Sequence, residues 1–465
     1  MSATPSLRSG AVGLGGAVIM SAALMGPAVS VYFNPQVAAQ QAGAATPFVF
    51  VIALVVVLVV ANSVVEMARV FPSAGSFYTY VSRAIGPRTG FVTGGLMFVA
   101  YALLVPAELA LIGTYTHDIL AGYGVQIHWT IISAVFAVLV VFLSLRGITG
   151  SLRTALALFG AEVVVIVLLS AVVLAKGGAH GLSVLPLLPT ESPNGLSGLA
   201  LGMVFGILSF VGFEAATTLG EEVRLPARNV PRGIYLSLFF VGVIYLFCTY
   251  AEMIGFGVDG VSRLVADAAP FTTLADKYAP WLKLLVGLAG ISSIFAVTMN
   301  SNNGIVRILY AMGREGLLPR LLAKVHPVHR TPTAAIWLQA AVAVVFTYVV
   351  GLISGPFNAY VYLGSVLTLA IIPVYMLTSV ACIRHFAGRR SWWRHLVLPV
   401  LGILLLLIPV YGQVYPVPAA PLRYFPYLVL IYLVVTAAIA IVLGRTRPAV
   451  LSRAGAILAT AKSDG

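Results

Sequence analysis

The chain has 465 residues, of which 60% are hydrophobic and only 9% are charged, and its formal net charge is +13. A soluble protein of this length could not hide so much apolar surface, and apolar runs of about 20 residues, long enough to cross a bilayer as helices, recur along the chain. The basic residues fall in short loops between these runs, which indicates membrane topology rather than nucleic-acid binding.

Twelve membrane-spanning helices are predicted. The runs are longer than the strands of a membrane barrel and do not alternate, and lipid offers no partner to backbone groups outside a helix. The predicted spans are residues 11–33, 46–69, 91–115, 127–146, 152–176, 195–220, 232–256, 281–308, 333–353, 358–384, 395–412 and 424–444.

The distribution of Lys and Arg predicts the orientation of the spans. With the N-terminus inside, 22 of the 27 basic residues lie in inner segments and five in outer ones. Such a bias marks the cytoplasmic side. We therefore expect residues 1–10 and 445–465 to be cytoplasmic in a protein of the cytoplasmic membrane, and we use "inner" and "outer" in this sense.

Two spans carry an interruption. "SAALMGPAVSVYF" (21–33) places Gly26-Pro27 in the middle of the first span, where Pro27 lacks an N–H and clashes with the preceding turn. "SFVGF" (209–213) places Gly212 in the sixth. Each broken span opens a set of five, residues 11–176 and 195–384, and an odd number of spans gives the two sets opposite orientations. Matching interruptions in two halves point to a transporter binding site at the midplane.

The ionisable residues predicted at membrane depth are all acids: Glu108, Glu162, Glu214 and Glu252. A carboxylate there costs about 2.5–3.5 kcal/mol on an insertion scale, so a set made only of acids suits proton handling or the binding of a cationic amine. Glu252, near the outer end of its span, could simply reach the interface. Glu66, near an inner end, is expected to pair with an arginine.

Glu162 is the residue that we expect to couple transport to protons, because it is the lone ionisable group in the apolar run of "GITGSLRTALALFGAEVVVIVLL" (147–169). It could alternate between protonated and charged forms, or stay protonated and bond a neighbouring helix. Glu214 follows Gly212, so it could cap the inner half-helix. It could instead pair with a substrate ammonium, pair with a cytoplasmic arginine during gating, or take part in proton coupling. Pro106 bends the third span near Glu108, which could then meet a substrate amine or stay buried and neutral.

The eighth span contains "SSIFAVTMNSNNG" (292–304), which could place hydroxyl and amide oxygens on one helix face. Ser292 and Ser293 are candidates for an ion site, because such oxygens could ligate sodium or an ammonium group. Polar side chains also join helices in lipid, so sodium coupling stays open.

Three segments resemble the amino acid–polyamine–organocation (APC) superfamily of secondary transporters. They are "FPSAGSFYTYVSRAIGP" (71–87), "FVGFEAATTLGEEVRLPARNVPRGI" (210–234) and "RILYAMGREGLLPRLLAKVHPVHRTP" (307–332). The resemblance implies an all-α fold of two inverted five-helix repeats with broken helices 1 and 6, two extra helices at 395–444, and alternating access. The substrate would contact the two breaks, at Ala23, Leu24, Met25, Gly26, Pro27, Ala28, Phe210, Gly212 and Phe213. Glu162 falls where proton-coupled members can carry a lysine.

The first break departs from the family pattern. Many amino-acid transporters of the family have a glycine-serine-glycine motif there, whose N–H groups hold the substrate carboxylate. Leu24-Met25-Gly26-Pro27 offers fewer free amides and no hydroxyl. It resembles the putrescine-importer-like branches as much as the α-amino-acid branches.

The sequence thus predicts a secondary transporter of amino acids or related organic amines that is coupled to protons. The alternatives are a putrescine-like amine importer or exchanger and a sodium-coupled symporter. The expected partners are a small-molecule substrate, a proton or sodium ion, and the lipid bilayer. No nucleophile–base pair or phosphate loop is found in the sequence, so we expect no catalytic residues, metal, cofactor or nucleic acid.

Overall fold

The computed structural model describes residues 13–72, 75–147, 152–218, 223–388 and 391–451, and these residues form helices and connecting turns without a strand. The predicted segment 1–10 lies outside the described residues, as does the end of 445–465. The α-helices are α1 (Leu14–Leu24), α2 (Pro27–Tyr32), α3 (Asn34–Ala42), α4 (Thr46–Val70), α5 (Ser76–Ala84), α6 (Pro87–Gly122), α7 (Trp129–Arg146), α8 (Leu152–Ala175), α9 (Gly195–Phe210), α10 (Ala215–Thr218), α11 (Pro226–Phe256), α12 (Val261–Ala266), α13 (Pro270–Tyr278), α14 (Lys283–Glu315), α15 (Thr333–Ser354), α16 (Pro356–His385), α17 (Leu398–Gly412), α18 (Phe425–Thr446) and α19 (Pro448–Leu451). Short 3-10 turns and one π-helical turn, η7 (Trp393–Val397), connect them.

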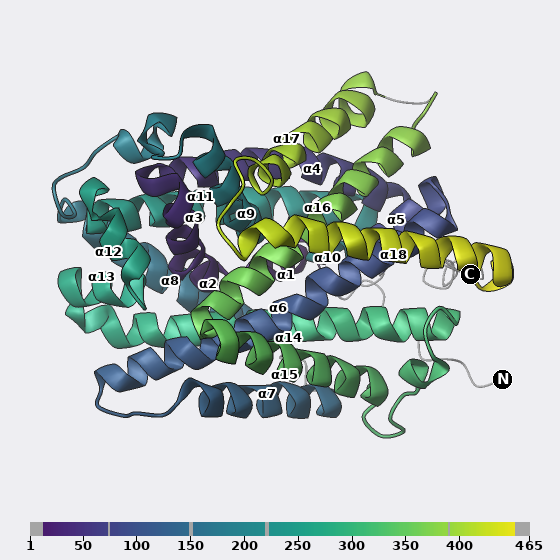
Figure 1. Ribbon diagram of the computed structural model, residues 1–465, viewed down its shortest axis with the longest axis horizontal. Helices are drawn as coiled ribbons and strands as arrows, with labels where there is room; N and C mark the ends of the chain where they lie inside the picture. The colour runs from purple at the N-terminus through teal and green to yellow at the C-terminus, as the bar shows by residue number, and fades with distance from the viewer. Residues whose placement is uncertain (1–12, 73–74, 148–151, 219–222, 389–390, 452–465) are drawn as a thin grey trace.

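Twelve helical segments within the described residues are long and apolar enough to cross a membrane, and each predicted span overlaps one of them. The prediction of a twelve-span, all-α membrane protein is confirmed. The spans run along the long axis of the molecule, with α12 and α13 at one end and α5 at the other (Figure 1). The two spans after the second five, which contain α17 and α18, pack against α4, α9, α16 and α6.

Contacts between loops agree with the predicted alternation of inner and outer ends. On the inner side, the Tyr78 hydroxyl after the second span donates to Glu315 Oε2 at the end of α14, at 2.5 Å. On the outer side, Lys176 Nζ after α8 donates to the carbonyl of Tyr278 in α13, at 2.6 Å. Segments assigned to the same side of the membrane therefore meet in space.

Helix α6 continues through Pro106, and its neighbour α15 supplies hydrogen-bond donors to backbone carbonyls of α6 at this point. Proline at 106 cannot donate to the carbonyl of Ala102, four residues earlier. Gln339 Nε2 donates to this carbonyl instead, at 3.1 Å, and Thr347 Oγ1 donates to the Pro106 carbonyl, also at 3.1 Å. Side chains of neighbouring helices commonly satisfy backbone groups that a membrane proline frees.

Candidate substrate and ion site

The first break falls at the predicted Gly26-Pro27. Helix α1 ends at Leu24 and α2 begins at Pro27, and Gly26 between them has φ +56° and ψ +73°, a left-handed conformation that glycine adopts at little cost. The carbonyl that this turn frees on Met25 accepts hydrogen bonds from the hydroxyls of Tyr245 and Ser30, each at 2.8 Å. The break is therefore a fixed part of the structure.

The second break falls at the predicted Gly212. Helix α9 ends at Phe210 and α10 begins at Ala215, and Gly212 has φ +107°. The Tyr245 hydroxyl also donates to the carbonyl of Ser209, at 3.0 Å. One side chain of α11 thus holds a carbonyl from each broken span.

The structure brings the two breaks into contact. A Cβ atom added to Gly212 would lie 2.8 Å from the Leu24 side chain. Of the first-break residues, Ala23 and Leu24 are partly exposed, and the following four are buried: Met25, Gly26, Pro27 and Ala28. The two phenylalanines of the second break are buried against tyrosines, Phe210 with its ring centroid 5.1 Å from that of Tyr245 and Phe213 5.6 Å from that of Tyr375.

Glu162 and the candidate ion-site serines form one group beside the first break. Glu162 in α8 is 5% exposed, and the hydroxyls of Ser293 and Ser292 in α14 interact with its carboxyl group. Ser293 Oγ also accepts a hydrogen bond from the N–H of Val29, in the first turn of α2, at 3.2 Å. Two predictions made separately, for a proton site and an ion site, therefore fall on the same group of residues.

Glu214 lies on the inner side of the second break, in a different group. Its Oε1 accepts from the Tyr101 hydroxyl at 2.5 Å, and its Oε2 accepts from the N–H of Gly212 at 3.1 Å and from the Tyr375 hydroxyl at 3.4 Å. The carboxyl group thus binds an N–H in the break, and the Ala216 N–H of α10 is capped by Ser21 Oγ of α1, at 3.1 Å.

Glu108 is a third, separate acid. It is 2% exposed in α6, and its Oε2 has no hydrogen-bond partner among the described residues. Tyr360 of α16 lies within electrostatic range of it. The Tyr360 hydroxyl donates to Asn34 Oδ1 at 2.5 Å, and Asn34 Nδ2 donates to Ser209 Oγ of α9 at 2.7 Å. A polar chain therefore leads from the neighbourhood of Glu108 to the second break.

The two remaining acids have different outcomes. Glu66 does pair with Arg69, at 3.5 Å, and also with His395 Nε2, at 3.0 Å. The expectation that Glu252 reaches the interface is wrong, because its side chain is 0% exposed. The segment between α11 and α14 covers this end of α11 with helices α12 and α13.

Sequence reasoning missed the side chains that hold the breaks in place: Asn34, Tyr101, Tyr245, Tyr360 and Tyr375. The available signal was weak, namely a hydroxyl or amide in an otherwise apolar span. Such a residue predicts a hydrogen bond somewhere in the bundle, but the partner depends on how distant helices pack.

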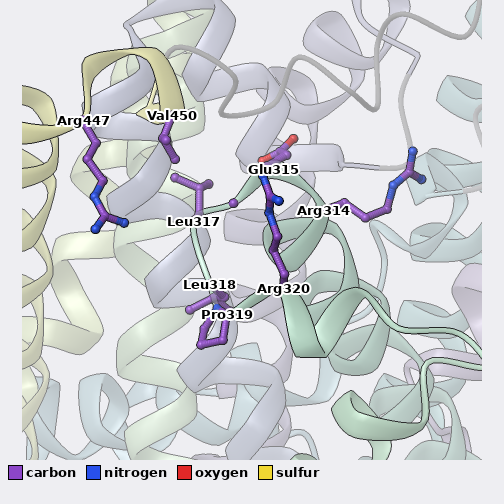
Figure 2. Close-up of a pocket in the computed structure, with 9 residues that line it drawn as sticks. Arg314, Glu315, Leu317, Leu318, Pro319, Arg320, Arg447 and Val450 are labelled. Atoms are coloured by element: carbon purple, nitrogen blue, oxygen red, sulfur yellow. The ribbon is translucent and has the colours of Figure 1, made fainter.

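A pocket lies elsewhere, at the inner end of α14. It has a volume of about 470 Å³ and is lined by Arg314, Glu315, Gly316, Leu317, Leu318, Pro319, Arg320, Arg447 and Val450. Figure 2 shows Arg447 and Arg320 on either side of the loop that carries Leu318, while Arg314 points away from it. This basic pocket lies on the predicted cytoplasmic side and is separate from the two breaks.

Comparison with known proteins agrees with this architecture. The family described as "Amino acid permease" matches residues 12–440. The chain is similar to the branched-chain amino acid permease BcaP of Lactococcus lactis, at 25% identity over 79% of this chain and 82% of that protein. It is also similar to BcaP of Bacillus subtilis, at 25% identity over 64% of this chain and 65% of that protein. The low-affinity putrescine importer PlaP of Escherichia coli is 30% identical over 64% of this chain and 66% of the importer.

The matched regions span just under two thirds of the Bacillus subtilis and Escherichia coli relatives. The family match, by contrast, covers nearly the whole chain, including both broken spans. It agrees with the twelve apolar spans of the fold. The chain therefore belongs to the amino acid permease family of the APC superfamily and is a multi-pass membrane protein.

Proposed function

We propose that the protein is a secondary transporter of amino acids or related organic amines that works by alternating access and is driven by protons. The observation that carries this proposal is the contact between the two breaks, with Glu162 linked to the first of them through Ser293. The names of the relatives support the substrate class, since they include branched-chain amino acid permeases and a putrescine importer.

The substrate site of this proposal lies between the breaks. The six residues from Ala23 to Ala28 present backbone groups there, Gly212 keeps the second backbone close, and Phe210 and Phe213 form apolar walls. Broken helices at matching positions provide such sites in many transporters. The apolar character of Leu24, Met25 and the two phenylalanines suits an aliphatic side chain or the methylene groups of an amine.

Glu162 is the proposed proton carrier. When it is protonated, its carboxyl group can share hydrogen bonds with Ser292 and Ser293 without a buried charge. When it is charged, Ser293 must turn its hydroxyl towards the carboxylate, and Ser293 is also the acceptor of the Val29 N–H. Protonation of one side chain thereby changes the support of helix α2, which is how a local charge can bias a conformational equilibrium.

An amine importer is the second candidate, because Glu108 offers a buried carboxylate oxygen that has no hydrogen-bond partner in the described part of the chain. An ammonium group of a substrate would supply the missing donor and offset the cost of the buried charge. Sodium coupling would instead use the hydroxyl oxygens of Ser292 and Ser293 together with Glu162.

The same proposal includes the topology. The inner ends, with most of the basic residues, face the cytoplasm, and the two sets of five spans, residues 11–176 and 195–384, act as inverted repeats with 395–444 outside them. Accessibility of single cysteines placed at Ser262 and Arg447 to an impermeant label on intact cells tests this orientation. Labelling of the residue 262 position alone agrees with it, and the reverse pattern contradicts it.

The activity is tested by uptake into proteoliposomes with an imposed pH gradient or an imposed sodium gradient. Branched-chain amino acids and putrescine are the first substrates to test. Accumulation driven by the pH gradient is the expected result. Accumulation driven only by the sodium gradient would show that sodium, and not the proton, is the coupling ion. The absence of uptake and exchange for every amino acid and amine tested would overturn the proposal.

Two variants that replace an acid by its neutral amide test the proposed roles of Glu162 and Glu108. Glu162→Gln should abolish accumulation driven by the pH gradient while exchange of substrate across the membrane continues, because exchange needs no net proton movement. Glu108→Gln should weaken the binding of an amine by about tenfold or more, which equals about 1.4 kcal/mol of binding free energy. The binding of a neutral zwitterionic amino acid should be less affected. Unchanged proton-driven accumulation in Glu162→Gln would remove its coupling role.

A further inference from the structure

Glu252 is a buried acid to which the proposed transport cycle assigns no role. It lies in the last turns of α11, near the outer end, and its side chain is 0% exposed. Neither Oε1 nor Oε2 has a hydrogen-bond partner among the described residues. By contrast, the carboxyl groups of Glu214 and Glu162 both interact with hydroxyl groups.

A second buried oxygen without a donor lies in the same region. Gln36 in α3 is 2% exposed, and its Nε2 donates to the carbonyls of Asp267 and Val265, at 2.5 and 3.0 Å. Its Oε1 accepts no hydrogen bond from any residue that the structure describes. Asp267 is also the charged group that acts electrostatically on Glu252. The surroundings of Glu252 are therefore rich in acceptors and include another acid.

The cations near the outer end of α11 are engaged elsewhere. Lys176, after α8, donates to the carbonyl of Tyr278, and Arg263 in α12 donates to the carbonyl of Phe256 at 3.1 Å. His180 lies 3.2 Å from Asp259. Lys277 Nζ of α13 lies 4.8 Å from the centroid of the Tyr278 ring, and Lys283 Nζ donates to Asp276 Oδ1 at 2.8 Å.

The other titratable groups described around Glu252 do not neutralise it either. The Tyr278 hydroxyl of α13 donates to the Gly255 carbonyl, at 2.9 Å, and Cys248, one turn before Glu252, has its Sγ 3.8 Å from the Ile166 carbonyl of α8. Removing one partner of a buried ion pair is strongly destabilising, because the remaining charge is left uncompensated. A charged Glu252 without any partner would carry a penalty of the same kind, so it has to be neutral when it is enclosed.

The elements that enclose Glu252 belong to the outer side of the transport path. Helix α2, the outer part of the first span, and helix α3, which follows it, close on the outer cover, which we define as α12 and α13 (residues 261–278). Besides the Gln36 bonds, Tyr32 stacks on Phe271 of the cover with ring centroids 4.7 Å apart, and its hydroxyl donates to the Val286 carbonyl of α14 at 3.1 Å. The outer cover also packs against α11, so opening of the outer side would expose the end of α11 that carries Glu252.

We propose that Glu252 is a second proton-binding site, distinct from Glu162, and that it takes up a proton when the outer side closes. Its carboxylate accepts a proton from hydronium in the outer water, which leaves a neutral carboxylic acid and a water molecule. Opening of the outer side rehydrates the group and reverses the transfer. This inference goes beyond the proposed function, because it holds for any substrate.

Linkage gives the direction of the effect. A group that must be protonated in the closed state favours closure at low outer pH, and this preference is lost as the pH rises. Each pH unit changes the ratio of closed to open molecules by at most about tenfold for a single proton.

The test measures closure of the outer side without substrate. Thr272, a half-buried residue of the outer cover whose Oγ1 lies 3.3 Å from the Tyr115 hydroxyl, is replaced by cysteine. Its reaction with an impermeant maleimide added outside proteoliposomes is followed over a range of outer pH. The labelling rate is divided by the rate for Ser262→Cys, an exposed position of α12, and this ratio corrects for the ionisation of the thiol. The parent chain, which has only the buried native cysteines, gives the background rate.

Labelling of Thr272→Cys relative to Ser262→Cys should rise with outer pH and should stay low at every pH when Glu252→Gln is added. Asp259→Asn is the matched control, an acid exposed on the same side, and should keep the pH dependence. The same pH profile with and without Glu252→Gln would overturn the proposal, and so would closure that depends on sodium at constant pH. Because a neutral residue suits the closed state, Glu252→Gln should also raise the apparent Tm at high pH, and a lower Tm at every pH would contradict the inference.

Discussion

Gly212 and Leu24 are in direct contact, and a Cβ atom on Gly212 would lie 2.8 Å from Leu24 Cγ and 3.1 Å from the Leu24 carbonyl carbon. Gly212 also has φ +107°, which side-chain-bearing residues rarely adopt. Gly212→Ala should therefore push the breaks apart and strain the backbone by about 1–3 kcal/mol. We expect loss of uptake in proteoliposomes and a lower apparent Tm.

Gly304→Ala is the matched control for this change. Gly304 lies inside α14, and an added Cβ would meet no atom of the described residues within 4 Å. It should be neutral or stabilising by up to about 1 kcal/mol, because alanine favours a helix interior. Uptake by Gly212→Ala at the level of Gly304→Ala would show that the two breaks do not need this contact.

Ser293→Ala should impair proton-driven accumulation more than Ser292→Ala does. Both serines interact with Glu162, but only Ser293 also accepts the Val29 N–H, at 3.2 Å. Losing that acceptor leaves a buried N–H unsatisfied, at a cost of about 1–3 kcal/mol. Initial rates under a pH gradient measure the difference.

A double-mutant cycle tests whether Ser293 acts through Glu162. The effect of Ser293→Ala on accumulation should be smaller in the Glu162→Gln background than in the parent, because the shared pathway is already lost. Full additivity of the two substitutions would indicate that Ser293 supports the break but not proton coupling.

The inner side of the protein should open more readily in the Tyr101→Phe variant than in the Tyr375→Phe variant. The Tyr101 hydroxyl donates to Glu214 at 2.5 Å, whereas Tyr375 lies 3.4 Å from it. The shorter bond to a carboxyl group is the stronger one. A cysteine at Thr217, a buried residue of α10, should react faster with a label from the inner side in Tyr101→Phe. Equal labelling rates in the parent and both variants would exclude a gating role for these bonds.

Gln339→Leu should destabilise the protein, because the Ala102 carbonyl then lacks both its helical donor and its replacement. The expected loss is about 1–3 kcal/mol. Adding Pro106→Ala should restore stability, since alanine supplies an N–H to that carbonyl. The apparent Tm of the single and double variants measures this rescue, and a double variant no more stable than Gln339→Leu would refute the repair of α6 by α15.

The positions of the breaks were predictable because their cause is local. Gly26-Pro27 and Gly212 are interruptions in the chain itself, and α1 and α9 end next to them. The role of Tyr245 was not predictable, since its two acceptors lie 220 and 36 residues away along the sequence. Nothing in the apolar pattern of α11 indicates which helices its hydroxyl faces.

Glu252 illustrates the same limit for burial. Distance from the end of a span suggested contact with the interface, but exposure depends on the connecting segment. The polar run between the seventh and eighth spans folds back as α12 and α13 over the end of α11. A loop that covers a helix end leaves no periodic signal in the helix it covers.

The two bonds from α15 to carbonyls of α6 have a consequence for motion. They attach α15 at Ala102 and Pro106, one helical turn apart, so rotation or sliding of α15 along α6 would break both at once. The pair should behave as one rigid body, whatever rearrangement carries substrate across. Spin labels on the exposed faces of these two helices should report a constant distance throughout the cycle. The pair can therefore serve as a fixed reference against which the movements of the other helices are measured.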